Sequence, residues 1–307
     1  MKFKLIFLAL LFSMCSNVTQ ENTEEIRVVS LSTTHTEVIQ TLGGQNTLVA
    51  IDAFSEVDFP VERVDAYTVT AEELAQLKPD VVIIAFDFNG IVDGLEGQEI
   101  DYVLLPPAKT FDDVYSQIEI VGDIINKRSE ASTKVRDMKL EINRILDNSN
   151  FGSVSVYHEI GYTYGIYSVN NESLIGQIYN SIGVENIAGL EEDPFGSGYP
   201  ALSEESVIES NPDFIVVGHS DYLNKDLSIR DGWGNLVAVQ NSNVYFLDDT
   251  LANNWGTTTV DLVKELSGVF EESAQTNVYS DYLLLLSFIV LGIMLFVFTR
   301  KTTKEIA

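Results

Sequence analysis

The chain has 307 residues, of which 45% are apolar, and a formal net charge of −28. This length and composition indicate a globular protein with one large domain or two ordinary ones, and they argue against a disordered chain. A surface of this sign repels nucleic acid, so nucleic-acid binding is excluded, although much of the acidity is typical of an ordinary solvated surface.

Residues 1–21 are predicted to be a secretory signal peptide and linker. Lys2 and Lys4 precede an apolar run from Leu5 to Met14 that only Ser13 interrupts, which is the layout of an export signal. The only cysteine is Cys15, so the mature body can contain no disulfide. Cys15 is either a lipid-attachment site or a residue that is removed with the signal. Lipid attachment usually requires Gly or Ala directly before the cysteine, and Met14 occupies that position here.

A second apolar run, near the other end of the sequence, predicts a transmembrane helix at residues 282–299. It follows a short stalk at 271–281 and precedes a basic tail at 300–307, and it is just long enough to cross a hydrocarbon core. The basic tail predicts a cytoplasmic C-terminus. A buried core helix is the alternative, but no polar face interrupts the run. We therefore expect a single-pass protein of the cell membrane with an extracytoplasmic binding domain.

The body opens with a β-α-β pattern. Val28–Leu31 is typical of a buried strand, residues 37–42 form an amphipathic helical run that stops at Gly43-Gly44, and residues 48–51 predict a second strand. Such units favour a parallel sheet.

A helix, a turn and a strand come next. Thr70 and Glu73 predict a capping box, Pro79-Asp80 a turn, and residues 81–85 a strand. One more strand is expected in EIDYVLLPP, residues 99–107, before a long region with helical signals. Residues 127–148 contain no Gly or Pro, so a helix here would span about 33 Å.

The strand-helix alternation then starts again. Strands are expected in SVSVYHE (153–159), in residues 214–218 and in NVYFLDD (243–249), and helices in residues 172–183, 203–210 and 257–270. Aligning Pro79-Asp80 on Pro212-Asp213 places Thr70 opposite Ser203 and the strand at 81–85 opposite that at 214–218, without a gap. The two Pro-Asp dipeptides alone could reflect a common type of turn before a strand. Such a turn would not explain why the residues of the two preceding helices also match. We therefore expect two similar lobes.

These patterns predict an α/β fold with an N-terminal lobe at 22–126, a connecting helix at 127–149 and a C-terminal lobe at 150–270. VVSLSTTHTEVIQTLGG, TAEELAQLKPDVVI, the long central helix, SEESVIESNPDFIVV and WGNLVAVQNSNVYFLDD, in this order, resemble the helical-backbone (class III) periplasmic binding proteins. These are substrate receptors of ABC importers for vitamin B12, ferric siderophores and heme. The resemblance covers residues 27–270.

The resemblance implies two lobes that are joined by one rigid helix, with the ligand held between them. It also implies that a glutamate on each lobe docks on arginines of the permease, and the matching positions here are Glu72 and Glu205. Two solvated glutamates near helix N-termini would have the same sequence pattern. The expected partners are an ABC permease with its ATPase subunit and a small-molecule metal chelate, either a cobalamin-type corrinoid or a ferric siderophore.

Polar and aromatic residues that follow strands or begin helices are the candidates for the cleft wall, because ligands of open α/β sheets bind beyond the carboxyl ends of strands. Aromatic faces suit a large planar or macrocyclic ligand. The candidates are Thr33, Thr34, His35, Asp52, Phe54, Tyr67, Phe86, Phe88, Tyr157, His158, Tyr162, Tyr164, Tyr199, His219, Tyr222, Trp233 and Trp255.

His35, His158 and His219 all fall at such tips. They leave open an alternative in which the protein binds a transition-metal ion directly or ligates heme iron. No regular ligand spacing supports that alternative, so the sequence predicts no resident cofactor.

No nucleophile elbow, P-loop or GxGxxG motif follows a strand, so we expect no enzymatic activity. A membrane-anchored sensor or adhesion module would retain the fold without the importer. The preferred interpretation is an extracytoplasmic receptor that delivers its ligand to a permease.

Overall fold

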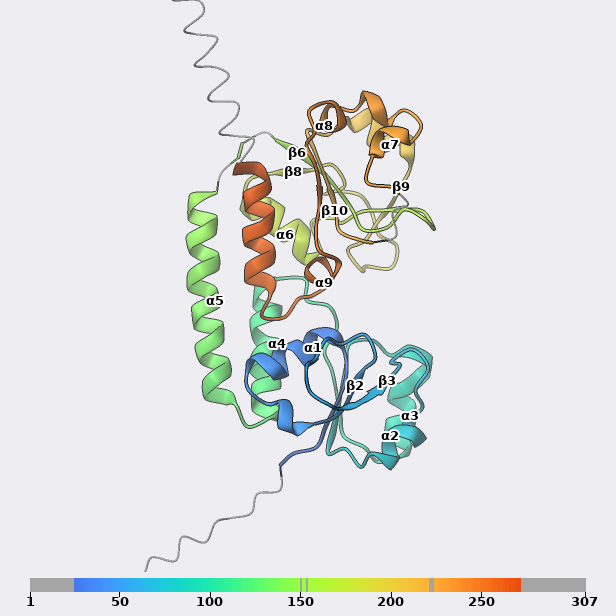
Figure 1. Cartoon of the computed structure of the whole chain (residues 1–307), viewed down its shortest axis with the longest axis vertical. Helices are drawn as coiled ribbons and strands as arrows, with labels where there is room; N and C mark the ends of the chain where they lie inside the picture. Colours follow the sequence, from blue (N-terminus) through green and yellow to red (C-terminus); the bar gives the residue numbers. More distant parts are fainter. Residues whose placement is uncertain (1–24, 150, 153, 221–223, 272–307) are drawn as a thin grey trace, which may run out of the picture.

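The computed structural model describes residues 25–149, 151–152, 154–220 and 224–271. They form two α/β lobes, one above the other in Figure 1, beside a long helix that runs along both. The predicted signal segment, transmembrane helix and basic tail lie outside the described residues. Within the described ranges, no helix combines the length and apolar character that crossing a membrane requires.

The N-terminal lobe is built on a parallel sheet with the strand order β3-β2-β1-β4-β5. The strands are β1 (Val28–Leu31), β2 (Leu48–Asp52), β3 (Glu62–Val64), β4 (Val81–Ile84) and β5 (Tyr102–Leu104). All residues of β1 and β4 are buried, as expected for central strands that helices cover on both faces. The helices of this lobe are α1 (Thr33–Thr41), α2 (Ala71–Gln76) and α3 (Ile91–Gly97).

The C-terminal lobe repeats this arrangement with a parallel sheet of order β11-β10-β6-β8 and a short antiparallel pair, β7-β9. The strands are β6 (Ser155–Glu159), β7 (Ile166–Tyr167), β8 (Glu185–Asn186), β9 (Ala201–Leu202), β10 (Phe214–Val217) and β11 (Val244–Phe246). The helices are α6 (Leu174–Ser181), α7 (Glu204–Ser210), α8 (Val237–Gln240) and α9 (Asp249–Ala252). Short 3₁₀ turns occupy Gln45–Thr47, Phe88–Gly90, Leu227–Ile229 and Trp233–Asn235.

The two Pro-Asp steps have the same structural role. Asp80 accepts a hydrogen bond at 2.7 Å from the backbone N–H of Arg27, directly before β1, and Asp213 accepts one at 2.9 Å from the N–H of Ser155, the first residue of β6. Each aspartate therefore ties the start of its own strand, β4 or β10, to the neighbouring strand. The preceding helices, α2 and α7, both begin in capping boxes.

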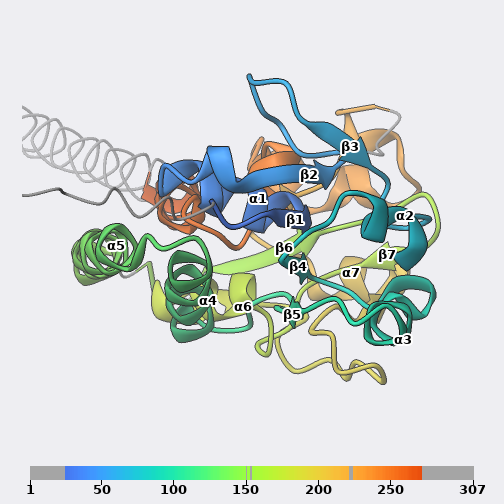
Figure 2. The same ribbon diagram turned by 90° about the horizontal axis from the view of Figure 1, so that it is seen from below.

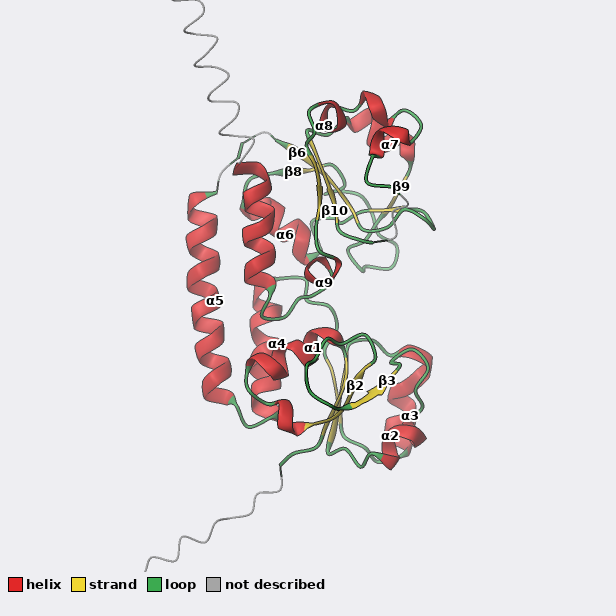
Figure 3. Cartoon of the chain, in the orientation of Figure 1, coloured by secondary structure: helices red, strands yellow, loops and turns green. Residues whose placement is uncertain are grey.

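Three helical segments lie along one long side of the molecule: α4 (Phe111–Ile124), α5 (Arg128–Asn148) and the helical residues 259–271 (Figure 3). One apolar core joins them to both sheets, with Ile118 from α4, Ile142 from α5, Leu262, Val28 from β1 and Phe214 from β10 among its members. The view from below in Figure 2 shows α4, α5 and α6 on the side of the molecule away from α2 and α3. This shared core holds the lobes together on the side opposite the opening between them.

The helices expected at 37–42 and 257–270 begin at residues that differ from the predicted ones. The helix expected at 37–42 starts at Thr33, because Ser32 is its N-cap and accepts a hydrogen bond from the N–H of His35 at 3.4 Å. His35 therefore belongs to the first turn of α1, and not to a loop at the strand tip. The last helix starts at residue 259 and not at 257.

Candidate functional site

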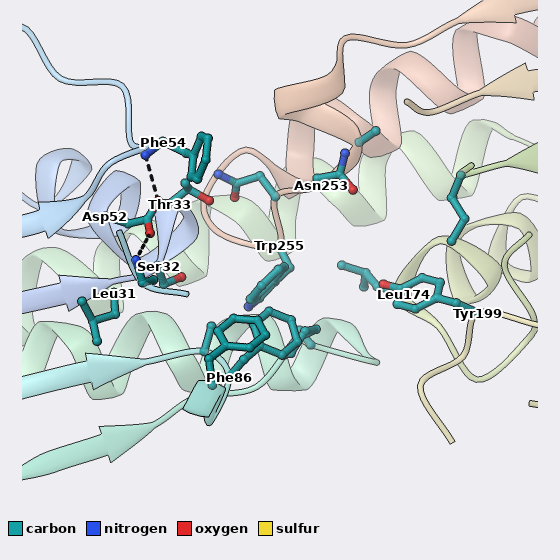
Figure 4. Close-up of a pocket in the computed structure, with 18 of the residues that line it drawn as sticks. Leu31, Ser32, Thr33, Asp52, Phe54, Phe86, Leu174, Tyr199, Asn253 and Trp255 are labelled. Carbon is teal, nitrogen blue, oxygen red and sulfur yellow. Dashed lines mark hydrogen bonds between the residues drawn. The ribbon is translucent and has the colours of Figure 1, made fainter. Parts of the chain in front are cut away.

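A cavity of about 430 Å³ lies between the lobes, at the carboxyl ends of the N-terminal strands. Its N-terminal wall comes from residues 31–33 at the end of β1 and just beyond it, Asp52 at the end of β2, residues 85–86 after β4 and residues 107–108 after β5. The opposite wall contains Ile160, Leu174, Ile175, Tyr199 and Leu262, together with the segment Ala252–Trp255. Figure 4 shows Phe86 beneath Trp255, with Leu174 and Tyr199 across the opening. Both lobes therefore contribute to one site.

Aromatic rings follow one another along this wall in the order Phe54, Tyr67, Phe88, Phe86 and Trp255. The successive ring centroids are 6.5, 4.5, 5.3 and 6.5 Å apart. Phe54 is 69% exposed and Tyr67 is 54% exposed. A row of exposed rings offers a large apolar area whose edges and hydroxyl can orient a flat ligand. We call these five residues the aromatic row.

The buried carboxylate of Asp52 shapes the wall. Its Oδ1 accepts a hydrogen bond from the N–H of Phe54 at 2.9 Å, and its Oδ2 accepts one from the N–H of Ala66 at 3.2 Å (Figure 4). Asp52 thus fixes the loop that presents Phe54 and Tyr67, and both of its oxygens already have partners.

Trp255 is held in place by Gln117 of α4. The Gln117 Oε1 accepts hydrogen bonds from Trp255 Nε1 at 3.1 Å and from His35 Nε2 at 3.0 Å, and its Nε2 donates to the carbonyl of Pro106 at 2.7 Å. A single amide therefore connects α1, the strand tip after β5 and the segment that carries Trp255. The sequence did not predict a role for Gln117, because a glutamine in a helix carries no pattern that indicates hydrogen bonds to distant residues.

A second cavity, of about 720 Å³, adjoins the first and shares Phe86, Pro107 and Tyr199 with it. Its other lining residues are Pro106, Lys109, Asp113, Ser116, Gln117, Gly196 and Ser197. Lys109 is the only basic side chain among the described residues that line the two cavities. The Pro-Pro pair at the end of the stretch 99–107 was a signal that could have pointed to this wall.

Eight of the predicted wall residues line the first cavity: Thr33, Asp52, Phe54, Tyr67, Phe86, Phe88, Tyr199 and Trp255. Six others are buried in the interior instead: Thr34, His35, Tyr157, His158, His219 and Trp233. The first four are buried because the first turn of α1 and the end of β6 pack inward against other elements. Tyr162 and Tyr164 are also absent from the lining, and Tyr164 is 94% exposed. Tyr222 lies outside the described residues.

The three histidines do not come together. His35 bonds to Gln117, His158 Nδ1 lies 2.6 Å from the hydroxyl of Tyr179, and His219 Nε2 donates to Glu159 at 3.0 Å. Burial lowers the pKa of His35 to about 4 and that of His158 to about 3. The described residues contain no group of three or more His, Cys, Asp or Glu side chains that could hold a metal ion. The direct metal-binding alternative therefore lacks its predicted ligand set.

A buried ion pair lies behind the C-terminal wall. Glu159 accepts two hydrogen bonds from Arg230, at 2.6 and 2.9 Å, and the guanidinium lies 3.7 Å from the ring centre of Tyr162. Burial opposes ionisation of Glu159, but hydrogen bonds from His219 and Arg230 and the charge of Arg230 outweigh it, so the pKa of Glu159 lies below its ordinary value. Ile160, the next residue, lines the cavity. The pair thus fixes the end of β6 that carries this wall.

The predicted docking glutamates occupy equivalent positions. Thr70 caps α2 and Ser203 caps α7, so Glu72 and Glu205 are each the second residue of their helix, and both are exposed. Figures 1 and 2 show α2 and α7 on the side of the molecule away from α5.

A family model described as "Periplasmic binding protein" matches residues 28–251. The chain is 27% identical over 255 residues to the ABC transporter substrate-binding lipoprotein YvrC of Bacillus subtilis, covering 80% of this chain and 79% of YvrC. It is 26% identical over 279 residues to the vitamin B12-binding protein of Vibrio parahaemolyticus, covering 87% of this chain and 96% of that protein.

Among solved structures, the heme-binding protein RhuT from Roseiflexus in its apo form matches with a TM-score of 0.72 and 19% identity, over 81% of this chain and 99% of RhuT. The two relatives named above are binding proteins and not enzymes.

Proposed function

The chain belongs to the periplasmic binding protein family, and from this premise we propose that it is an extracytoplasmic receptor that captures a metal chelate between its lobes and delivers it to an ABC permease. The observation that carries the proposal is the aromatic row, which faces a cavity built by both lobes. The relatives named as an ABC transporter substrate-binding lipoprotein and a vitamin B12-binding protein support it.

The ligand class that the lining favours is a bulky macrocycle with little net charge, such as a cobalamin-type corrinoid. The aromatic row supplies a broad apolar contact, while Thr33, Asn253 and Asn254 offer neutral polar groups. Amide-rich ligands match such groups, whereas a ligand with several carboxylates needs several cationic partners. Lys109 alone cannot provide them, so the lining favours a corrinoid over a polycarboxylate siderophore complex.

Heme is the second candidate. Tyr67 and Tyr199 both line the first cavity, and a tyrosine phenolate can ligate heme iron. A heme would use these tyrosines and not the three histidines, which are buried or bonded elsewhere. The two propionates of heme would share the single cation Lys109, which makes heme the weaker match.

We propose that the protein docks on its permease through Glu72 and Glu205. Their exposure and matching helix positions, on the same side of the molecule, would let two carboxylates meet two guanidinium groups at once. We further propose that residues 282–299 anchor the receptor beside its permease, so that docking does not require diffusion from solution.

The ligand is identified by titrating the purified full-length chain in detergent with cyanocobalamin, hemin, ferrichrome, ferric citrate and Zn²⁺. The chain has two tryptophans, and Trp233 is fully buried, so a Trp233→Phe variant leaves Trp255 as the reporter in the wall. We expect saturable quenching by cyanocobalamin. Quenching by hemin alone would establish the second candidate, and a response to none of the five ligands would contradict the receptor role.

Docking is tested separately by measuring ligand uptake in cells that carry the permease. Glu72→Arg together with Glu205→Arg should abolish uptake and leave ligand affinity unchanged. Glu209→Arg is the matched control, because Glu209 is also exposed on α7. Loss of affinity in the double variant, or equal loss of uptake in the control, would refute the docking assignment.

A further inference from the structure

We propose that the second cavity is a subsite for a distinct arm of the ligand, an arm that joins a flat apolar ring to one anionic group. The inference rests on the proposed function, since the body of the same ligand occupies the first cavity. It adds a second recognition element, with its own residues, on the side of the cleft nearest α4.

Continuity between the cavities is the first support. Phe86, Pro107 and Tyr199 line both, so the two cavities are direct neighbours and one ligand that lies against the aromatic row can extend toward the second. The second cavity is the larger of the two, at about 720 Å³ against about 430 Å³. A single compact disc would leave that larger volume unfilled.

The lining of the second cavity differs from that of the first. Pro106 and Pro107 after β5 oppose Tyr199 of the C-terminal lobe, with Phe86 at the junction. Two proline rings and two aromatic rings make rigid apolar walls, which suit a flat ring that inserts edgewise. They offer few fixed polar partners for an amide-rich macrocycle.

The charge in this cavity comes from Lys109. The carboxylate of Asp113 is committed to the start of α4, where its Oδ2 accepts hydrogen bonds from the N–H of Lys109 at 3.1 Å, the N–H of Thr110 at 2.9 Å and the hydroxyl of Thr110 at 2.9 Å. The ammonium of Lys109, in contrast, donates to the backbone carbonyl of Gly196 at 2.6 Å and forms no ion pair with a carboxylate of the described residues. One cation thus faces this cavity, and the only carboxylate among its described lining residues, that of Asp113, is bonded through Oδ2 to the start of α4.

The bond between Lys109 and Gly196 can be exchanged without loss of the loop that carries Gly196. That loop is ordered by Asp193, which accepts hydrogen bonds from the hydroxyl of Ser197 at 2.6 Å and the N–H of Gly198 at 2.8 Å. These bonds hold the pKa of Asp193 well below its ordinary value, and the bond from the Ser197 hydroxyl has the largest effect. An anionic oxygen forms a stronger charge-assisted bond with an ammonium than a neutral carbonyl does. Lys109 can therefore turn from Gly196 to the ligand while Asp193 keeps the loop in shape.

A corrinoid with a nucleotide arm has this chemistry, because its arm carries one phosphodiester and ends in an aromatic base. Cobinamide has the same macrocycle and lacks the arm. Isothermal titration calorimetry of the full-length chain with cyanocobalamin and dicyanocobinamide therefore separates the two cavities. For the unmodified chain we expect cyanocobalamin to bind about 10-fold more tightly, the size of one charge-assisted hydrogen bond.

Two variants locate the effect. Lys109→Met removes the cation, and Ser116→Trp fills the cavity from the exposed face of α4. Both should weaken cyanocobalamin binding about 10-fold and leave dicyanocobinamide binding unchanged. Glu119→Trp, also exposed on α4 but absent from the lining, is the matched control and should change neither affinity.

The outcomes separate the two claims. Equal affinity for the two corrinoids, or variants that weaken both equally, would overturn the subsite and leave a corrinoid receptor standing. Failure of both corrinoids to bind the unmodified chain would overturn the corrinoid proposal together with the subsite.

Discussion

The carboxylate of Glu37 in α1 accepts a hydrogen bond at 3.1 Å from the backbone N–H of Thr257, which lies 220 residues further along the chain. The hydroxyl of Thr257 also donates to Glu37. Thr257 lies two residues before the last helix, whose residues 259–271 pack along α5, so a side chain of the N-terminal lobe holds the start of that helix. Trp255 lies two residues before this contact, and the tie therefore helps to set one wall of the cavity.

Replacing Glu37 with Ala should destabilise the protein by about 1–3 kcal/mol, because the N–H of Thr257 loses its acceptor in a half-buried place. Glu37→Gln is the matched variant, since it keeps an acceptor oxygen and should cost less. Urea unfolding of both variants measures the difference in the free energy of unfolding. Equal stability of Glu37→Ala and the unmodified chain would show that the contact carries no weight.

Gln117→Leu should lower ligand affinity about 10-fold by freeing Trp255, since the indole N–H and the buried His35 both lose their acceptor. In the Trp233→Phe background, the fluorescence anisotropy of Trp255 should fall in the absence of ligand. That readout distinguishes positioning from a general loss of stability. Glu119→Leu on the same helix is the control, and an unchanged anisotropy in Gln117→Leu would contradict the positioning role.

Breaking the buried pair of Glu159 and Arg230 should cost about 3–5 kcal/mol in either single variant, Glu159→Met or Arg230→Met, because each leaves the other partner buried without its full set of bonds. The double variant Glu159→Met with Arg230→Met should be closer to the unmodified chain than either single variant. Guanidinium unfolding of the three variants forms a double-mutant cycle. Additive losses would mean that the two side chains do not act as a pair.

Stability should fall as the pH drops from 7 to 5, in part because of His35. Its folded-state pKa of about 4 lies below the ordinary value, so the unfolded chain takes up a proton near pH 6.5 while the folded chain does not until about pH 4. The stability present above the unfolded pKa is therefore lost as the pH falls, by about 2 kcal/mol for this group at pH 5.

His35→Gln removes this proton uptake, so its unfolding free energy should depend less steeply on pH than that of the unmodified chain. Urea titrations at pH 7, 6 and 5 compare the two slopes. Parallel curves would show that His35 is not kept neutral by burial.

The local patterns predicted most of the strands and the repeated unit, because central parallel strands need continuous apolar runs and helix starts need capping side chains. The capping box at Thr70 and the strand at Val28–Leu31 are found as predicted, and Ser203, which aligns with Thr70, caps α7. The binding-protein family inferred from the order of these patterns is confirmed by the match over residues 28–251. The predicted extent of each lobe and the docking role of Glu72 and Glu205 stay predictions.

The composition of the site was harder to predict. The rule of strand ends and helix starts selected Phe54, Tyr67 and Phe86, which line the cavity, but it also selected Tyr157 and His158, which the structure buries. A strand tip indicates that a residue is near the cleft and does not indicate on which face its side chain packs.

By itself the sequence determined the alternation of strands and helices, the duplication of the lobe and the acidic character of the protein, since these depend on neighbouring residues and on composition. Only the tertiary structure decided which aromatic rings form the wall and that Gln117, Lys109 and the two prolines complete it. Gln117 meets Trp255 across 138 residues, and Lys109 meets Gly196 across 87. Contacts at such separations arise when the packing of whole elements brings them together, and no local pattern in the chain encodes them.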